Sequence, residues 1–172
     1  MQFFAVAALL ASAVATYAVP TPSMAMPQAS VRLDQTYDNP NGNLNGVACS
    51  TGENGLVTKG QSVLFILERA GYLHQVSGFT TFDSLPAFPY VGGAFPASFN
   101  SPNCGSCWRL TYAETGKSIN ILAIDSAGWN TFNVGRTALD ELTNGRAVEL
   151  GGVPITYEQV DEWECSRVHA GH

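Results

Sequence analysis

The chain has 172 residues, enough for a single domain with its own hydrophobic core. Only 13% of the residues are charged, and the formal net charge is −6 at pH 7. This sparse and mildly acidic charge argues against a nucleic-acid partner and against adsorption to an anionic membrane surface. A neutral, polar partner is therefore expected.

Residues 1–18 have the pattern of a signal peptide, although no Lys or Arg precedes the apolar run. The run from Phe3 to Ala15 is almost wholly apolar, is followed by small residues and is too short to span a bilayer. The alternative is a buried N-terminal helix. We predict a secreted, extracellular protein that also associates with the cell wall. Residues 19–29, rich in Pro, Ser and Ala, are predicted to form a flexible lead-in.

From residue 30 onward, short strands alternate with turns. Ser118–Asp125 is almost entirely apolar, which predicts a strand buried on both faces. Thr137–Gly145 has apolar residues at helical spacing and ends in Asn-Gly, so it predicts a short helix. The other predicted strands are Ser30–Asp38, Trp108–Tyr112 and Ile155–Val160. Together these elements indicate a mainly β barrel or sandwich.

Four cysteines in a secreted chain indicate two disulfides, and the spacing leaves three pairings open. Cys104-Gly-Ser-Cys107 also matches other kinds of site. A redox motif needs a following helix, whereas the residues from Trp108 favour a strand. A zinc site needs two more ligands nearby, and the His residues of the chain do not have the spacing of zinc ligands. The papain-type protease signature needs a His about 130–150 residues downstream, which the chain after Cys107 is too short to hold.

Eight motifs occur in a consistent order between about residues 30 and 165. They are Ser30-Val-Arg-Leu-Asp-Gln-Thr-Tyr37, Val47-Ala-Cys-Ser50, Gly55-Leu56, Leu85-Pro-x-Phe-Pro-x-Val-Gly-Gly93, Asn100-Ser-Pro-Asn-Cys-Gly-Ser-Cys-Trp108, Ile119-x-Ile-Leu-Ala-Ile-Asp-Ser126, Gly128-Trp-Asn-x-Phe-Asn133 and Tyr157-x-Gln-Val160. With these motifs in this order, the chain resembles the cerato-platanin family of small secreted fungal proteins. The resemblance implies a mainly β, single-domain double-psi β-barrel with short helices, similar to the barrel of expansins. It also implies two disulfides, Cys49–Cys104 and Cys107–Cys165.

The family pattern covers residues 30–167, with 168–172 as a tail, but it is interrupted by Gln61–Gly78. This dense apolar segment differs in composition from the turn-rich segments around it, and the family pattern resumes directly after it. We interpret 61–78 as an atypical insertion, with a retained intron in the gene model as one hypothesis and a genuine loop as the alternative. The sequence of the spliced transcript distinguishes the two.

Asp125 is the first candidate for a binding residue, because it follows a buried strand and can project into a groove at the barrel edge. The alternative for Asp125 is a structural role in fixing a loop. The alternative for Asp34 and Gln159 is that they only cap loops. Trp129 is expected either to cover the apolar side of a sugar ring or to pack on the barrel, whereas Trp108 is expected in the core. Four further residues match family positions expected near the same groove, so the predicted carbohydrate-binding set is Asp34, Tyr37, Asp125, Trp129, Asn133 and Gln159.

The resemblance implies a non-enzymatic protein, expected to be a monomer, that binds chitin or N-acetylglucosamine oligomers, with cellulose as a second candidate ligand. It implies expansin-like loosening of polysaccharide and recognition by plants, through a surface receptor, as an elicitor of defence. The alternative is a weak glycoside hydrolase that uses Asp125 with a second carboxylate, Asp34 or Asp83, since hydrolysis needs two carboxyl groups about 5–9.5 Å apart. No cofactor, metal, nucleic-acid partner or membrane partner is expected.

Overall fold

The computed structural model of the chain describes residues 26–59 and 79–166. The predicted signal peptide, the insertion at 61–78 and the tail at 168–172 lie outside the described residues, so each stays a prediction. The predicted lead-in lies outside them as well, except for its last residues.

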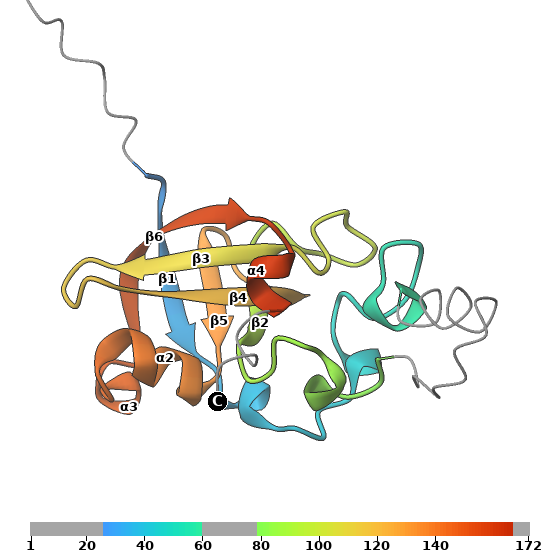
Figure 1. Ribbon diagram of the computed structural model, residues 1–172, viewed down its shortest axis with the longest axis horizontal. Helices are drawn as coiled ribbons and strands as arrows, with labels where there is room; N and C mark the ends of the chain where they lie inside the picture. Colours follow the sequence, from blue (N-terminus) through green and yellow to red (C-terminus); the bar gives the residue numbers. More distant parts are fainter. Residues whose placement is uncertain (1–25, 60–78, 167–172) are drawn as a thin grey trace, which may run out of the picture.

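The described chain folds into a closed barrel of six strands, ordered β1–β5–β2–β4–β3–β6 around the barrel (Figure 1). Two of the pairings are parallel, β1 with β5 and β2 with β4, and the others are antiparallel. The strands are β1 (Gln28–Leu33), β2 (Val91–Ala94), β3 (Cys107–Tyr112), β4 (Lys117–Ser126), β5 (Thr131–Val134) and β6 (Gly152–Val160). The predicted mainly β barrel is confirmed.

Short helices lie around the barrel ends. In Figure 1, α2 and α3 lie together below the strands. Helix α2 ends where Asn144 (φ 58°) and Gly145 (φ 83°) adopt the left-handed conformation, as the Asn-Gly signal predicts. The helices that lie clear of the undescribed segments are α2 (Arg136–Thr143), α3 (Ala147–Leu150) and α4 (Trp163–Ser166), and the 3₁₀ helices are η1 (Gln35–Asp38), η2 (Leu44–Gly46) and η3 (Phe82–Ser84).

The first strand differs from its prediction at both ends. β1 starts at Gln28, inside the predicted lead-in, and stops at Leu33 instead of continuing to Asp38. The carboxylate of Asp34 accepts the backbone N–H of Thr36 (3.0 Å), and this starts η1 in place of further strand. An Asp side chain that bonds nearby backbone offers the chain a turn instead of a sheet ladder.

The barrel interior is filled by large apolar side chains from every wall. Phe132, Leu110 and Ile121 are completely buried. In β4, the four residues Ile121–Ile124 are all buried, so the predicted burial on both faces is confirmed. The backbone of this part of β4 also bonds the loops that precede β3, since Ala123 N–H donates to the Ser106 carbonyl and Cys49 N–H donates to the Ile124 carbonyl.

Two disulfides tie these loops to the barrel, Cys49–Cys104 and Cys107–Cys165, the pairing that the resemblance implies. The first joins two loops beside the end of β4, where the Cys49 N–H also bonds the Ile124 carbonyl (3.2 Å). The second joins the start of β3 to α4. The segment between Cys104 and Cys107 is therefore the point through which both loop systems are held.

Candidate functional site

The Asp125 carboxylate, near the end of β4, is held by three hydrogen bonds. Its Oδ1 atom accepts the backbone N–H groups of Ala48 (2.9 Å) and Ser126 (2.8 Å). Its Oδ2 atom accepts the hydroxyl of Tyr37 (3.3 Å). A carboxylate has room for about four such bonds. The half-buried Asp125 therefore fixes a loop and also keeps acceptor capacity on Oδ2.

Tyr37 is a buried support for Asp125 and presents little surface to a ligand, since its side chain is only 4% exposed. Its ring packs near Phe82, with ring centroids 6.1 Å apart. Burial raises the pKa of Tyr37 well above its usual value, and the carboxylates of Asp125 and Asp34 raise it further. The phenol thus stays neutral and donates its hydrogen bond to Asp125.

A β-bulge decides which way Asp125 faces. Gly92 pairs with Ala123, but Gly93 pairs with Asp125, so one extra residue of β4 is accommodated between the two pairs. Without this shift, alternation from the buried Ala123 would turn Asp125 toward the barrel interior. A bulge re-aims side chains in this way, and here it places Asp125 on the outer side of the barrel.

Strand register puts four residues in one row across the outer side of the barrel. Arg32 pairs with Asn133, and Asn133 pairs with Gly93, which pairs with Asp125. Neighbouring strands are about 4.8 Å apart, so Asn133 and Asp125 lie roughly 10 Å apart. Gly93 between them has no side chain, and the Tyr37 hydroxyl lies above it, 3.1 Å from where a Cβ atom would stand. We call Arg32, Asn133, Gly93 and Asp125 the outer row.

Gln159 and Trp129 do not belong to the outer row. Gln159 is exposed in β6 opposite Trp108 of β3, near the end of the barrel. Trp108 is 7% exposed, which confirms the prediction that it is a core residue. Trp129, in the loop between β4 and β5, is 90% exposed and touches Phe95 edge-on, with ring centroids 6.0 Å apart. Gln159 and Trp129 therefore lie at a barrel end.

An aromatic cluster supports the exposed Trp129 ring. Phe95 contacts Phe132 and Tyr157 edge-to-face, at 5.6 Å and 5.5 Å between centroids. Edge-to-face pairs of this kind stabilise beyond their buried area. The loop itself is closed by a hydrogen bond from the Thr131 hydroxyl to the Trp129 carbonyl (3.2 Å). The exposed Trp129 ring is thus supported by the aromatic cluster and by the hydrogen bond within its loop.

The remaining predicted residue, Asp34, starts η1 through its bond to Thr36 and acts on the site only through its charge near Tyr37. Sequence reasoning missed Arg32 and Gly93. Their place beside Asp125 depends on strand register, which the sequence pattern alone does not specify between distant strands. Among the described residues, no group of His, Cys, Asp or Glu is arranged to hold a metal ion.

The family model described as Cerato-platanin matches residues 29–80 and 68–168. The chain belongs to the cerato-platanin family. The two matched pieces overlap at the end of the segment interpreted as an insertion, a prediction that this observation leaves open. Within residues 26–59 and 79–166, no helix is long and apolar enough to cross a membrane.

Curated relatives support the assignment. The Heat-stable 19 kDa antigen of Coccidioides posadasii is 37% identical over 166 residues, covering 96% of this chain and 98% of the relative. Allergen Asp f 15 of Aspergillus fumigatus is 42% identical over 87% of this chain and 86% of its own. Cerato-platanin of Ceratocystis fimbriata f. sp. platani is 35% identical over 71% of this chain and 75% of its own.

Solved structures agree with this family. Cerato-platanin 3 from M. perniciosa is similar with a TM-score of 0.66 and 38% identity, over 81% of this chain and 98% of its own. The solution structure of the fungal elicitor Cerato-Platanin is similar with a TM-score of 0.62 and 33% identity, over 80% of this chain and 97% of its own. The barrel described above is therefore the family's fold.

Proposed function

We propose that this cerato-platanin is a secreted protein that binds cell-wall polysaccharide. The main expected ligands are chitin or N-acetylglucosamine oligomers, and cellulose is a second candidate. In this proposal it loosens the polysaccharide without cutting it and acts as an elicitor of plant defence. The observation that carries the binding proposal is the outer row. There, a carboxylate of fixed orientation stands beside a glycine and an amide on the outer side of the barrel.

The outer row suits sugar hydroxyls, which both donate and accept hydrogen bonds. Asp125 Oδ2 supplies an acceptor, and the Asn133 side chain carries one acceptor and two donors. The Tyr37 hydroxyl and the Ser126 carbonyl cover the buried Gly93 between them, so a sugar meets the two side chains and the phenol oxygen rather than the strand backbone. Trp129 supplies a separate apolar plate that can cover the C–H side of a sugar ring.

Loosening without cleavage follows from binding alone. A glycan chain that bonds to the protein gives up hydrogen bonds to its neighbouring chains, so chain packing weakens without a covalent step. Hydrolysis requires a second carboxyl group on the other side of the bond. Both candidates for that role are engaged in local turns, since Asp34 accepts the Thr36 N–H and Asp83 accepts the Thr81 hydroxyl. This supports a non-hydrolytic role.

Secretion and elicitation rest on the sequence and the relatives. The apolar N-terminal run has the pattern of a signal peptide. One similar structure is titled a fungal elicitor, and other relatives are named antigen and allergen, names that denote recognition by a host. Perception by a plant surface receptor is the corresponding proposal for this chain.

NMR titration of the oxidised protein with chitin oligomers tests the binding site. We expect shifts at Asp125, Asn133 and Gly93, and roughly tenfold weaker binding in Asp125→Asn, the loss of one charge-assisted hydrogen bond. Glu162→Gln is the matched control, because it removes the same charge from an exposed residue after β6. An unchanged affinity in Asp125→Asn would overturn the proposed site.

Assay of reducing ends separates the two functional classes. Incubation with chitin or cellulose should release no new reducing ends, while the polymer becomes more swollen or more accessible. A release that disappears in Asp125→Asn would overturn the non-hydrolytic proposal in favour of a glycoside hydrolase.

A further inference from the structure

Arg32 differs from the other arginines in the described part of the chain, because it lacks an acidic partner. Among residues 26–59 and 79–166, Arg109, Arg136 and Arg146 each form ion pairs with Asp or Glu. No hydrogen bond or ion pair of the Arg32 side chain occurs within that part of the chain. An exposed arginine is ordinary in itself. In a chain of net charge −6, however, acidic partners are abundant, and none is placed beside this one.

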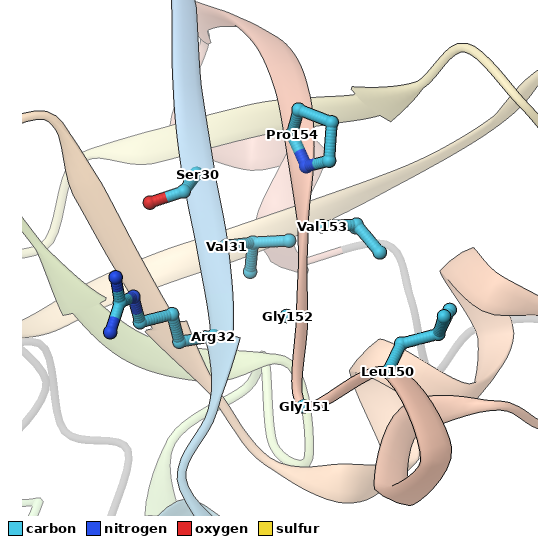
Figure 2. Close-up of a pocket in the computed structure, with 8 residues that line it drawn as sticks. All are labelled: Ser30, Val31, Arg32, Leu150, Gly151, Gly152, Val153 and Pro154. Carbon is cyan, nitrogen blue, oxygen red and sulfur yellow. The ribbon is translucent and has the colours of Figure 1, made fainter.

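Arg32 has uncharged neighbours, polar ones along the strands and apolar ones, Leu150 and Pro154, in the hollow beside it. Its cross-strand neighbours are Asn133 on β5 and Gly152 on β6. Ser30 lies on the same side of β1, and Figure 2 shows the Ser30 and Arg32 side chains projecting together, opposite to Val31. The Ser30 hydroxyl is 3.3 Å from the hydroxyl of Thr131. Arg32 therefore shares the outer side of β1 with a hydroxyl and lies beside an amide-bearing residue of β5.

A hollow of about 480 Å³ opens beside Arg32, between β1, β6 and α3 (Figure 2). Its floor is formed where Gly151 and Gly152 lack side chains. A Cβ atom on Gly152 would lie 2.7 Å from the Val31 carbonyl oxygen and 3.2 Å from the Arg32 side chain. The absence of a side chain at Gly152 therefore leaves the hollow beside Arg32 unfilled.

Arg32 also lies in the outer row, at the opposite end from Asp125. Three strand spacings separate them, roughly 14 Å. A ligand that follows the row meets a fixed negative charge at one end and an unpaired positive charge at the other. A guanidinium matches the planar geometry of a carboxylate and binds it through two parallel hydrogen bonds.

We propose that Arg32 is a subsite for the carboxylate of a uronic acid residue within a glycan that lies along the outer row. This rests on the proposed function, because it extends the same glycan-binding face. Asp125 repels a carboxylate at its end of the row, so the acidic sugar is positioned at Arg32 and the chain direction is set. The overall negative charge of the protein disfavours densely charged polymers, so the ligand is a glycan with occasional acidic residues.

A tetrasaccharide of three N-acetylglucosamine residues and one glucuronic acid is the probe, because it places a single carboxylate in an otherwise neutral chain. Its carboxyl-reduced form is the matched neutral ligand. By calorimetry at low salt, we expect wild type to bind the acidic form about tenfold more tightly than the neutral form. Arg32→Gln should abolish this preference. Lys117→Gln, which removes an exposed positive charge from another strand, should retain it. The preference should also shrink as salt is added.

Three results separate the two proposals. If chitin oligomers bind at Asp125 while the acidic and neutral tetrasaccharides bind equally, the proposed function stands and the Arg32 subsite is overturned. An acidic preference that survives Arg32→Gln overturns the subsite as well. If no glycan binds, both proposals fail together.

Discussion

The carboxylate of Asp38 accepts a hydrogen bond from the backbone N–H of Arg136 (2.6 Å), 98 residues later in the chain. It also accepts the N–H of Thr137 (3.1 Å). The first turn of α2 is therefore capped by η1, an element from the other end of the domain. Gly135 allows this close approach, since a Cβ atom there would lie 2.6 Å from the Asp38 carboxylate.

Asp38→Ala should lower the free energy of unfolding by about 1–2 kcal/mol, because it leaves two N–H groups of α2 without an acceptor. Asp38→Asn keeps an acceptor oxygen and should lose less. Urea denaturation measures both. If the two variants unfold at the wild-type midpoint, the cap contributes nothing to stability.

Tyr37→Phe should lower the free energy of unfolding by about 1 kcal/mol, because the buried hydroxyl donates to Asp125 and to no other described group. The same change removes one of the three donors that orient the carboxylate, so affinity for chitin oligomers should fall as well. The Ala48 amide resonance reports the orientation directly, because that N–H bonds Asp125 Oδ1. An unshifted Ala48 resonance with unchanged affinity would show that Tyr37 does not position Asp125.

The sequence pattern predicts the elements whose signal is local, a continuous apolar run or a turn signal at a helix end. The apolar run at Ser118–Asp125 lies within β4, and the Asn-Gly stop ends α2. The residues that pack on both sides of β4 require apolar side chains from Ile121 to Ile124, so this part of the pattern is visible in the sequence alone. The predicted end of β1 is wrong because the hydrogen bond from the Thr36 N–H to the Asp34 carboxylate starts a 3₁₀ turn despite the alternating pattern.

The candidate site was only partly predictable for a different reason. Asp125 was identified by its place at the end of a buried strand, but its direction depends on the bulge between β2 and β4. A one-residue shift turns a side chain to the other face of a sheet. No local pattern encodes that shift between strands far apart in sequence. For the same reason the sequence does not show that Trp129 and Gln159 lie at a barrel end, outside the outer row.

Stability should fall in alkaline solution through Tyr90 and Tyr37. Burial and the hydrogen bond to Glu141 raise the pKa of Tyr90 to about 12. Because the folded pKa is above the unfolded value of about 10, the neutral phenol contributes stability that is complete below about pH 10. That contribution is lost as pH rises toward 12. Tyr37 acts in the same direction.

Denaturation midpoints measured across this alkaline range check the effect, together with the phenolate absorbance of the folded protein. Tyr90→Phe should reduce the slope of stability against pH without removing it, since Tyr37 remains. An identical slope in wild type and Tyr90→Phe would exclude Tyr90 as a source of the loss.

The two disulfides should differ in their effect on glycan binding but not on stability. Their sequence separations are 55 and 58 residues, so the chain-entropy account assigns each about 4 kcal/mol. Replacing either pair by alanine should lower the free energy of unfolding by a similar amount. Only Cys49–Cys104 anchors the loop whose Ala48 N–H holds the Asp125 carboxylate.

Removal of Cys49–Cys104 should therefore weaken binding of chitin oligomers under conditions where the variant is still folded, while removal of Cys107–Cys165 should leave affinity near the wild-type value. Titrations at low temperature, with circular dichroism to verify folding, make the comparison. Equal losses of affinity would mean that the disulfides act on binding through overall stability. A loss confined to Cys49–Cys104 would show that the loop at Ala48 orients the carboxylate that meets the sugar.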